Sequence, residues 1–279
     1  MYKVKDNKLV FKNGSIKEGI IAVASGKGGV GKSTVTVNLA TAIARLDKKV
    51  GIIDADVHGF SIPRIIGLKD EAEAVNEKEI IPPEANGVKV ISMGSFVGEG
   101  SPVIWRGPLL TRALEQFIQD VHWGELDYLL LDLPPGTGDM ALNIMQKLPH
   151  AETLIITTPQ ITATNVAGRI GKMAEKMNSD VMGIIENMSY YQCTKCGNKD
   201  YIFGQGGGEA LAERLNTKLL GKLPLITSVR EKGDEGKPIV MVDESSPVSK
   251  AFYNIARNII DREVEFDTSK APMNFKNAK

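Results

Sequence analysis

The sequence predicts an α/β fold of the doubly wound kind, in which a mostly parallel sheet carries helices on both faces. Two observations lead to this prediction. Short apolar runs, typical of buried strands, recur at residues 20–24, 49–54, 88–93, 128–133, 153–158, 181–186 and 219–223. Helical patterns separate many of them, at residues 34–46, 108–121, 140–148, 162–177 and 208–215. Strands that alternate with helices of this length are joined by right-handed crossovers, which produces a parallel sheet covered on both sides.

The chain of 279 residues is long enough for one large α/β domain, which we expect over residues 20–264. Residues 1–19 form an N-terminal extension whose alternation of polar and apolar residues around Asp6 and Asn7 indicates an edge hairpin. Residues 248–260 repeat apolar residues at the spacing of a helix with one buried stripe. Because its polar face mixes both charges, we expect this helix to pack on the core rather than on a membrane. Residues 265–279 are predicted to be a flexible tail.

The charge balance excludes some classes of partner. The chain has 34 basic and 34 acidic residues, so it lacks the positive excess that attracts nucleic acid or anionic lipid. No apolar stretch approaches the roughly 20 residues that span a bilayer, and the first 20 residues are too polar for a secretory signal. We therefore expect a soluble, cytoplasmic protein that binds neither nucleic acid nor membrane.

A glycine-rich segment lies between the first predicted strand and the first predicted helix. Residues 26–33, GKGGVGKS, match the phosphate-loop pattern G-x-x-x-x-G-K-[ST]. Glycines let successive N–H groups converge on phosphates, and the following helix presents its unpaired N–H groups and the positive end of its dipole. Lys32 would neutralise the β- and γ-phosphates, the Ser33 hydroxyl would coordinate Mg²⁺, and Thr34 would donate to the α-phosphate. The predicted nucleotide-binding residues are Gly26, Lys27, Gly28, Gly29, Val30, Gly31, Lys32, Ser33 and Thr34.

Acidic residues end two of the predicted strands. Asp132 follows the apolar run LLL, the pattern of an aspartate that holds Mg²⁺ or its water beside a phosphate loop. The segment PPGTG at residues 134–138 suits a loop whose N–H group senses the γ-phosphate. Asp54 and Asp56 come just past the second strand, where a carboxylate could align the attacking water and accept its proton.

A second lysine, Lys27, makes the phosphate loop unusual. The segment GKGGVGKST resembles the deviant Walker A motif of the group that contains MinD, ParA, nitrogenase reductase and Mrp. The resemblance implies that Lys27 reaches across a dimer to the partner's nucleotide, that Asp56 orients the attacking water, and that Asp54 lies near the metal. It also implies that Asn187, which ends the strand over residues 181–186, reads the adenine edge and selects ATP over GTP.

The only cysteines, Cys193 and Cys196, lie in a polar insert over residues 190–203. Two thiolates at the spacing C-x-x-C can hold one side of a metal ion or cluster, but tetrahedral zinc or a cubane cluster needs four ligands. A two-fold dimer would bring two pairs together and supply four thiolates.

With this pair the sequence resembles the Mrp, or ApbC, branch of iron-sulfur cluster carrier ATPases. The resemblance extends from residue 20 to about residue 261 and includes the motifs DADVHG, DLPPGTG and C-x-x-C. It implies a slow, homodimeric ATPase that uses Mg²⁺, assembles an iron-sulfur cluster, expected to be 4Fe-4S, between two chains, and delivers it to apo-proteins. Lys27, Lys32 and Asp56 are the expected catalytic residues.

Other functions remain open from the residues alone. The cysteine pairs could bridge a structural zinc, or act as a redox dithiol. A positioning ATPase of the MinD or ParA sort is a different class of function, but it would need a basic amphipathic terminal helix or a basic face. A small-molecule kinase could use the same phosphate loop, although no acceptor-site motif is evident.

Overall fold

The structure is a computed structural model that describes residues 2–56, 59–76, 79–96, 107–193 and 195–270. Its central sheet contains, in the described part of the chain, seven parallel strands: β3 (Gly14–Ser25), β4 (Val50–Asp54), β8 (Val88–Ser92), β9 (Gly124–Asp132), β10 (Ala151–Thr157), β11 (Val181–Glu186) and β14 (Leu219–Lys222). The short strand β7 (Glu84–Ala85) joins β8 in antiparallel fashion. Each predicted strand is present, and the predicted α/β class is confirmed.

The strand order is β14-β11-β10-β3-β9-β4-β8-β7. The chain therefore leaves β3 toward one side of the sheet for β4 and β8, and later returns past β9 to the other side for β10. A doubly wound sheet binds its ligand where the strand order reverses, beyond the carboxyl ends of the strands. Here that point lies at the end of β3, where the glycine-rich loop begins.

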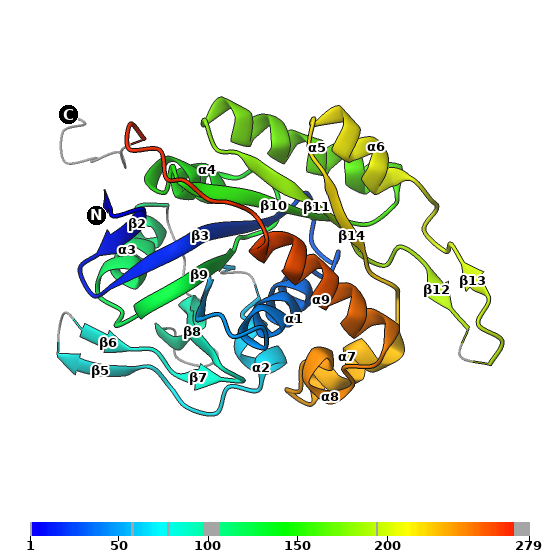
Figure 1. The fold of residues 1–279 in the computed structure, drawn as a ribbon, viewed down its shortest axis with the longest axis horizontal. Coiled ribbons are helices and arrows are strands. Elements are labelled where there is room, and N and C mark those ends of the chain that lie inside the picture. Colours follow the sequence, from blue (N-terminus) through cyan, green and yellow to red (C-terminus); the bar gives the residue numbers. More distant parts are fainter. Residues whose placement is uncertain (1, 57–58, 77–78, 97–106, 194, 271–279) are drawn as a thin grey trace.

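Helices cover both faces of the sheet (Figure 1). The helices are α1 (Lys32–Ala44), α2 (Ile62–Ile66), α3 (Gly107–Gln119), α4 (Asp139–Lys147), α5 (Ile161–Lys176), α6 (Gly207–Arg214), α7 (Thr227–Asp234), α8 (Ile239–Val242) and α9 (Pro247–Ile260), with a short 3-10 helix at Met93–Phe96. The five predicted crossover helices and the predicted helix near the C-terminus are among them. The short helices α2, α7 and α8 were not predicted, since four to eight residues carry little periodicity.

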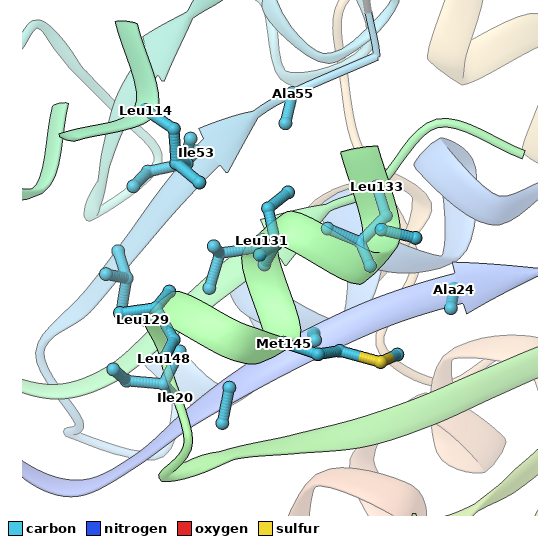
Figure 2. Packing of buried hydrophobic residues seen from close by; sticks show 14 of the residues in the cluster. Ile20, Ala24, Ile53, Ala55, Leu114, Leu129, Leu131, Leu133, Met145 and Leu148 are labelled. Carbon is cyan, nitrogen blue, oxygen red and sulfur yellow. The ribbon is translucent and has the colours of Figure 1, made fainter. Parts of the chain in front are cut away.

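Alternate residues of the central strands feed two separate cores. In β3, Ile20 and Ala24 face the core that α3, α4, α5 and α6 complete, whereas Ile21 and Val23 face the core beneath α1 and α9. Figure 2 shows part of the first core, with Leu129 and Leu131 of β9 lying near Met145 of α4. Because both faces of the strands are buried, their sequence is continuously apolar rather than alternating.

The N-terminal residues form a hairpin of β1 (Lys3–Lys5) and β2 (Lys8–Phe11), which turns at Asp6 and Asn7 with φ of 52° and 49°. Among the described residues, β1 pairs only with β2, so the hairpin forms an edge beside the start of β3. Strand β2 pairs with the start of β3, because β3 extends beyond the residues that pair with β10. This pairing is possible because β3 begins six residues before the predicted strand.

The expected flexible tail over 265–279 starts with packed residues. Phe266 is only 8% exposed, its N–H donates to Asn7 Oδ1, and its ring contacts that of His150. The physical reason is a nearby apolar surface, made by Tyr2 and Phe11 of the N-terminal hairpin. Residues 271–279 lie outside the described residues.

Two further hairpins lie outside the central sheet: β5 (Glu73–Asn76) with β6 (Glu79–Ile81), and β12 (Tyr191–Gln192) with β13 (Lys199–Asp200). Figure 1 shows the second hairpin extending well away from the central sheet. It forms the insert that carries the cysteines. None of the helices in the described ranges has the length and apolar character that a membrane span requires.

Candidate functional site

The glycine-rich loop connects the end of β3 to the first turn of α1. Gly29 and Gly31 have φ of 80° and 82°, a region that residues with a side chain rarely adopt. Gly26 is needed for a different reason, since a Cβ atom there would lie 2.5 Å from the backbone nitrogen of Ala167 in α5. The loop thus wraps tightly at the start of α1, as a phosphate-binding loop requires.

Lys32 is the first residue of α1, and only 6% of it is exposed. Its ammonium nitrogen lies 2.6 Å from Asp132 Oδ2 and 3.6 Å from Asp56 Oδ2. These contacts bring together three residues that were predicted from separate parts of the sequence. A cation held between two acids at the mouth of the loop is in position to meet a phosphate.

Asp132 ends β9 and is fully buried. Besides the bond to Lys32, its carboxylate accepts hydrogen bonds from the Ser33 hydroxyl at 2.6 Å and from the Thr36 hydroxyl at 2.7 Å. Thr36 was not predicted as a site residue. Its position four residues after Lys32, on the same face of α1, is the signal that could have identified it.

Asp54 ends β4 and is also fully buried. Burial, together with the nearby charge of Asp132, raises the pKa of Asp54 to about 7. Its carboxylate accepts hydrogen bonds from the Ser92 hydroxyl at 3.1 Å and from the Asp56 N–H at 3.2 Å, which favour the ionised form but do not outweigh burial.

The donor set at this point fits a magnesium ion. Ser33 offers a hydroxyl, and Asp132 and Asp54 offer carboxylates, which are the hard oxygen ligands that Mg²⁺ prefers. A divalent cation here would also relieve the repulsion between the two buried acids. Asp56, less buried than either, stands next to the cluster through its contact with Lys32. The loop after Asp132 approaches β3, where Gly136 N–H donates to Ser25 O at 2.8 Å.

A cavity of about 280 Å³ adjoins the loop on the side of α9. Its lining is mainly apolar and includes Gly31, Thr34, Asn187, Met188, Leu225 and Phe252. The Asn187 side chain donates from Nδ2 to Val30 O at 2.8 Å. This bond fixes the orientation of the amide and leaves its acceptor, Oδ1, for the role expected from the sequence, a contact with the exocyclic amine of adenine.

Lys27 does not join the cluster around Asp132. Its ammonium group donates to Gln160 Oε1 at 3.1 Å, in the loop that precedes α5. The next residue, Ile161, is 76% exposed. Lys27 is thus held at the outer side of the loop, beside an exposed apolar side chain.

Cys193 and Cys196 lie in the turn between β12 and β13, where Gly197 has φ of 73°. Two backbone bonds shape the turn: Cys193 N–H donates to Asn198 O, and Gly197 N–H donates to Cys193 O, both at 2.9 Å. The backbone N–H groups of Cys196 and Lys195 point at the Cys193 sulfur and lower the pKa of that thiol. Among the described residues, no further Cys, His, Asp or Glu completes a metal site with this pair.

Comparisons with known proteins agree with this geometry. A family model described as ParA: NUBPL iron-transfer P-loop NTPase matches residues 16–260. The chain is 52% identical over 239 residues to the iron-sulfur cluster carrier protein of Bacillus subtilis (strain 168), a match that covers 86% of this chain and 67% of that protein. It is 49% identical to the protein of the same name from Mycobacterium leprae (strain TN), a match that covers 88% of this chain and 65% of that protein. It therefore spans about two thirds of the length of these bacterial relatives.

An archaeal relative matches over most of its length. The iron-sulfur cluster carrier protein of Pyrococcus horikoshii is 45% identical over 264 residues, with 90% of this chain and 89% of that protein covered. Among solved structures, a nucleotide-binding protein from Archaeoglobus fulgidus in complex with ADP is 39% identical, with a TM-score of 0.71. The match covers 85% of this chain and 92% of that protein. The cell division ATPase MinD of Pyrococcus furiosus is 25% identical, with a TM-score of 0.66. That match covers 87% of this chain and 98% of MinD.

Proposed function

Because this chain belongs to the family of NUBPL iron-transfer P-loop NTPases, we propose that it is an ATPase that carries an iron-sulfur cluster on Cys193 and Cys196 and delivers it to apo-proteins. The observation that carries the proposal is that the chain combines a glycine-rich loop, with Lys32 and Asp132 beside it, and a hairpin with two thiols. Neither feature alone distinguishes a cluster carrier from other P-loop proteins. Their combination is what a carrier driven by a nucleotide requires.

In the proposed reaction, ATP binds with Mg²⁺ at the glycine-rich loop. Lys32 would contact the β- and γ-phosphates, and Ser33, Asp132 and Asp54 would hold the metal ion. The oxygen of a water molecule bonds to the γ-phosphorus, the bond to the bridging oxygen of ADP breaks, and Asp56 accepts the proton of the water. We expect hydrolysis to be slow, since the role of such a reaction is to switch a conformation.

The proposed cluster is cargo and not a resident cofactor. One chain offers two thiols, so we propose that a homodimer supplies the four thiolates of a 4Fe-4S cluster. The N–H donors on the Cys193 sulfur support this role, because they stabilise the thiolate that binds iron. Lys27 stands beside the exposed Ile161, on a surface that a second copy could cover, which supports its proposed role at the partner's nucleotide.

Free thiols persist in a reducing compartment, so the proposal assigns the protein to the cytoplasm. We also propose that the protein binds neither nucleic acid nor membrane, because its acidic and basic residues are equal in number. Binding of the purified protein to liposomes or DNA with ATP present would instead favour a positioning ATPase.

Anaerobic reconstitution with iron and sulfide tests the proposal. The protein should acquire the visible absorbance of a cluster and run as a dimer, and Cys193→Ala and Cys196→Ala should lose both properties. Transfer to an apo-ferredoxin should depend on ATP and fail in Lys32→Ala. A colourless protein that holds tight zinc under the same conditions would contradict the proposal and favour a structural metal.

A further inference from the structure

Glu186 joins the two chain segments that lead to and from the cysteine hairpin. It is the last residue of β11 and is fully buried. One carboxylate oxygen, Oε1, accepts a hydrogen bond from the Ser189 hydroxyl at 2.6 Å, and the other, Oε2, accepts one from the Gly208 N–H, also at 2.6 Å. Ser189 precedes β12, and Gly208 follows β13 at the start of α6. A single side chain therefore holds both ends of the insert.

The base of the hairpin has no spare room. A Cβ atom on Gly208 would lie 2.9 Å from the Glu186 Cβ, and one on Gly207 would lie 2.1 Å from Pro159 O. The backbone bond from Ser189 N–H to Leu223 O, at 2.9 Å, fixes the outgoing segment to the end of β14. Close-packed contacts of this kind pass a displacement on instead of absorbing it.

The residues at the foot of the β12-β13 hairpin also lie next to the proposed nucleotide site, at two points. Asn187, next to Glu186, lines the proposed adenine cavity and bonds to Val30 of the phosphate loop. On the other side, Pro159 is followed by Gln160, which accepts the hydrogen bond from Lys27. These two contacts of the loop thus end at Asn187 and Gln160, which are adjacent in sequence to Glu186 and Pro159 at the foot of the hairpin.

We propose that Glu186 is a positioning residue that couples the nucleotide state to the orientation of Cys193 and Cys196. The inference rests on the proposed function, because it assigns to Glu186 the transmission that a nucleotide-driven carrier needs. A nucleotide that moves Val30 or Lys27 shifts Asn187 or Gln160, and the carboxylate of Glu186 passes the shift to both ends of the hairpin together.

A bond to only one end would let the hairpin pivot about the other. The bidentate arrangement prevents this pivot, which is why a carboxylate is suited to the position and an amide is not. Glutamine has a single acceptor oxygen, so it satisfies Ser189 or Gly208 but cannot accept from both in the present geometry. Its size is the same, so Glu186→Gln removes one bond with little change in packing.

The experiment measures coupling rather than stability. The full chain is reconstituted anaerobically, and the rate at which an iron chelator removes the cluster is measured with and without ATP and Mg²⁺. The ratio of the two rates is the coupling factor, and we expect at least about a fivefold effect in the unchanged protein. In Glu186→Gln the factor should fall toward one, while the dissociation constant for ATP stays within about threefold.

Two further variants complete the test. Ser189→Ala removes only the hydrogen bond from the Ser189 hydroxyl to Glu186 and should lower the coupling factor in part. This variant keeps the inference testable if Glu186→Gln folds poorly. Glu209→Gln changes the adjacent, more exposed acid of α6 and should leave the factor unchanged.

A full coupling factor in both Glu186→Gln and Ser189→Ala would overturn the inference, as would a chain that holds a cluster but shows no effect of ATP on its release. Failure of the unchanged chain to take up a cluster would instead overturn the proposed function, so the two failures are distinguishable.

Discussion

Asp54 and Asp132 are direct neighbours across the parallel strands β4 and β9, and both are fully buried at the carboxyl ends of these strands. Lys32 contacts Asp132 at 2.6 Å, whereas the hydrogen-bond donors to Asp54 among the described residues, the Ser92 hydroxyl and the Asp56 N–H, are neutral. The two acids therefore differ in their surroundings. This difference explains why the pKa of Asp54 rises to about 7, through burial first and the charge of Asp132 second.

The raised pKa of Asp54 predicts how stability depends on pH. In the unfolded chain the carboxyl of Asp54 has its ordinary pKa of 3.8. Between about pH 4 and pH 7 the folded protein therefore keeps a proton on Asp54 that the unfolded chain has lost. The contribution of Asp54 to the free energy of unfolding therefore falls as pH rises through this window. Asp54→Asn should remove this slope and, in metal-free buffer at pH 8, stabilise the protein by roughly 1–3 kcal/mol.

Urea unfolding midpoints between pH 4 and pH 8, measured with a chelator present, check this prediction. Asp70→Asn, which changes an exposed acid, serves as the control and should leave the pH profile unaltered. Parallel profiles for Asp54→Asn and the unchanged protein would contradict the predicted pKa.

Removal of the Lys32 side chain should strongly weaken nucleotide binding. Its ammonium group lies at the start of α1, where the phosphates are expected, and charge-assisted bonds to phosphate contribute about 1.5–3 kcal/mol each. We expect Lys32→Ala to weaken ATP binding at least about 100-fold by calorimetry. Lys48→Ala removes a lysine that pairs with Glu18 away from the loop, and it should bind ATP normally. ATP binding that survives in Lys32→Ala would exclude the site as described.

Much of the nucleotide site is predictable because its signals are local. The loop over residues 26–33 is one continuous motif, and Asp132 is identified by the apolar run before it. The meeting of Lys32 with Asp132 follows from the parallel sheet, since strands that end at one edge bring their last residues together.

The remaining contacts depend on segments that are distant in sequence. The bond from Lys27 to Gln160 spans 133 positions, and that from Gly208 to Glu186 crosses the whole cysteine insert. Nothing in the composition of residues 190–203 indicates where its two ends attach. The packing of Phe266 was missed for the same reason, because its partners belong to the N-terminal hairpin and to His150.

The orientation of Asn187 predicts preference for adenine. With Nδ2 bonded to Val30 O, the amide presents an acceptor, which suits the amine of adenine and repels the carbonyl oxygen of guanine. Asn187→Ala should weaken ATP binding about 5- to 30-fold and change GTP binding less, as expected for one lost hydrogen bond of about 1–2 kcal/mol. Competition measurements with both nucleotides check this, with the exposed Asn254→Ala as control. An unchanged ratio of ATP to GTP affinity would contradict the role.

The Cys193 thiol should react as a thiolate at lower pH than an ordinary cysteine. The N–H groups of Cys196 and Lys195 stabilise its charge and lower its pKa, and these donors belong to the backbone. They remain when the Cys196 side chain is removed. In metal-free Cys196→Ala, the rate of alkylation by iodoacetamide should therefore reach its half-maximum below about pH 8.5, the value for a free thiol.

The same protein in urea is the matched reference, because unfolding removes the N–H donors but keeps the sequence. Gly197→Ala supplies a second comparison: the left-handed φ of 73° disfavours a side chain, so this change should distort the turn and raise the midpoint toward that of the unfolded chain. Equal midpoints in folded and unfolded protein would mean that the turn does not activate the thiol. A lower midpoint in the folded chain would mean that the turn stabilises the thiolate of Cys193 relative to the unfolded chain.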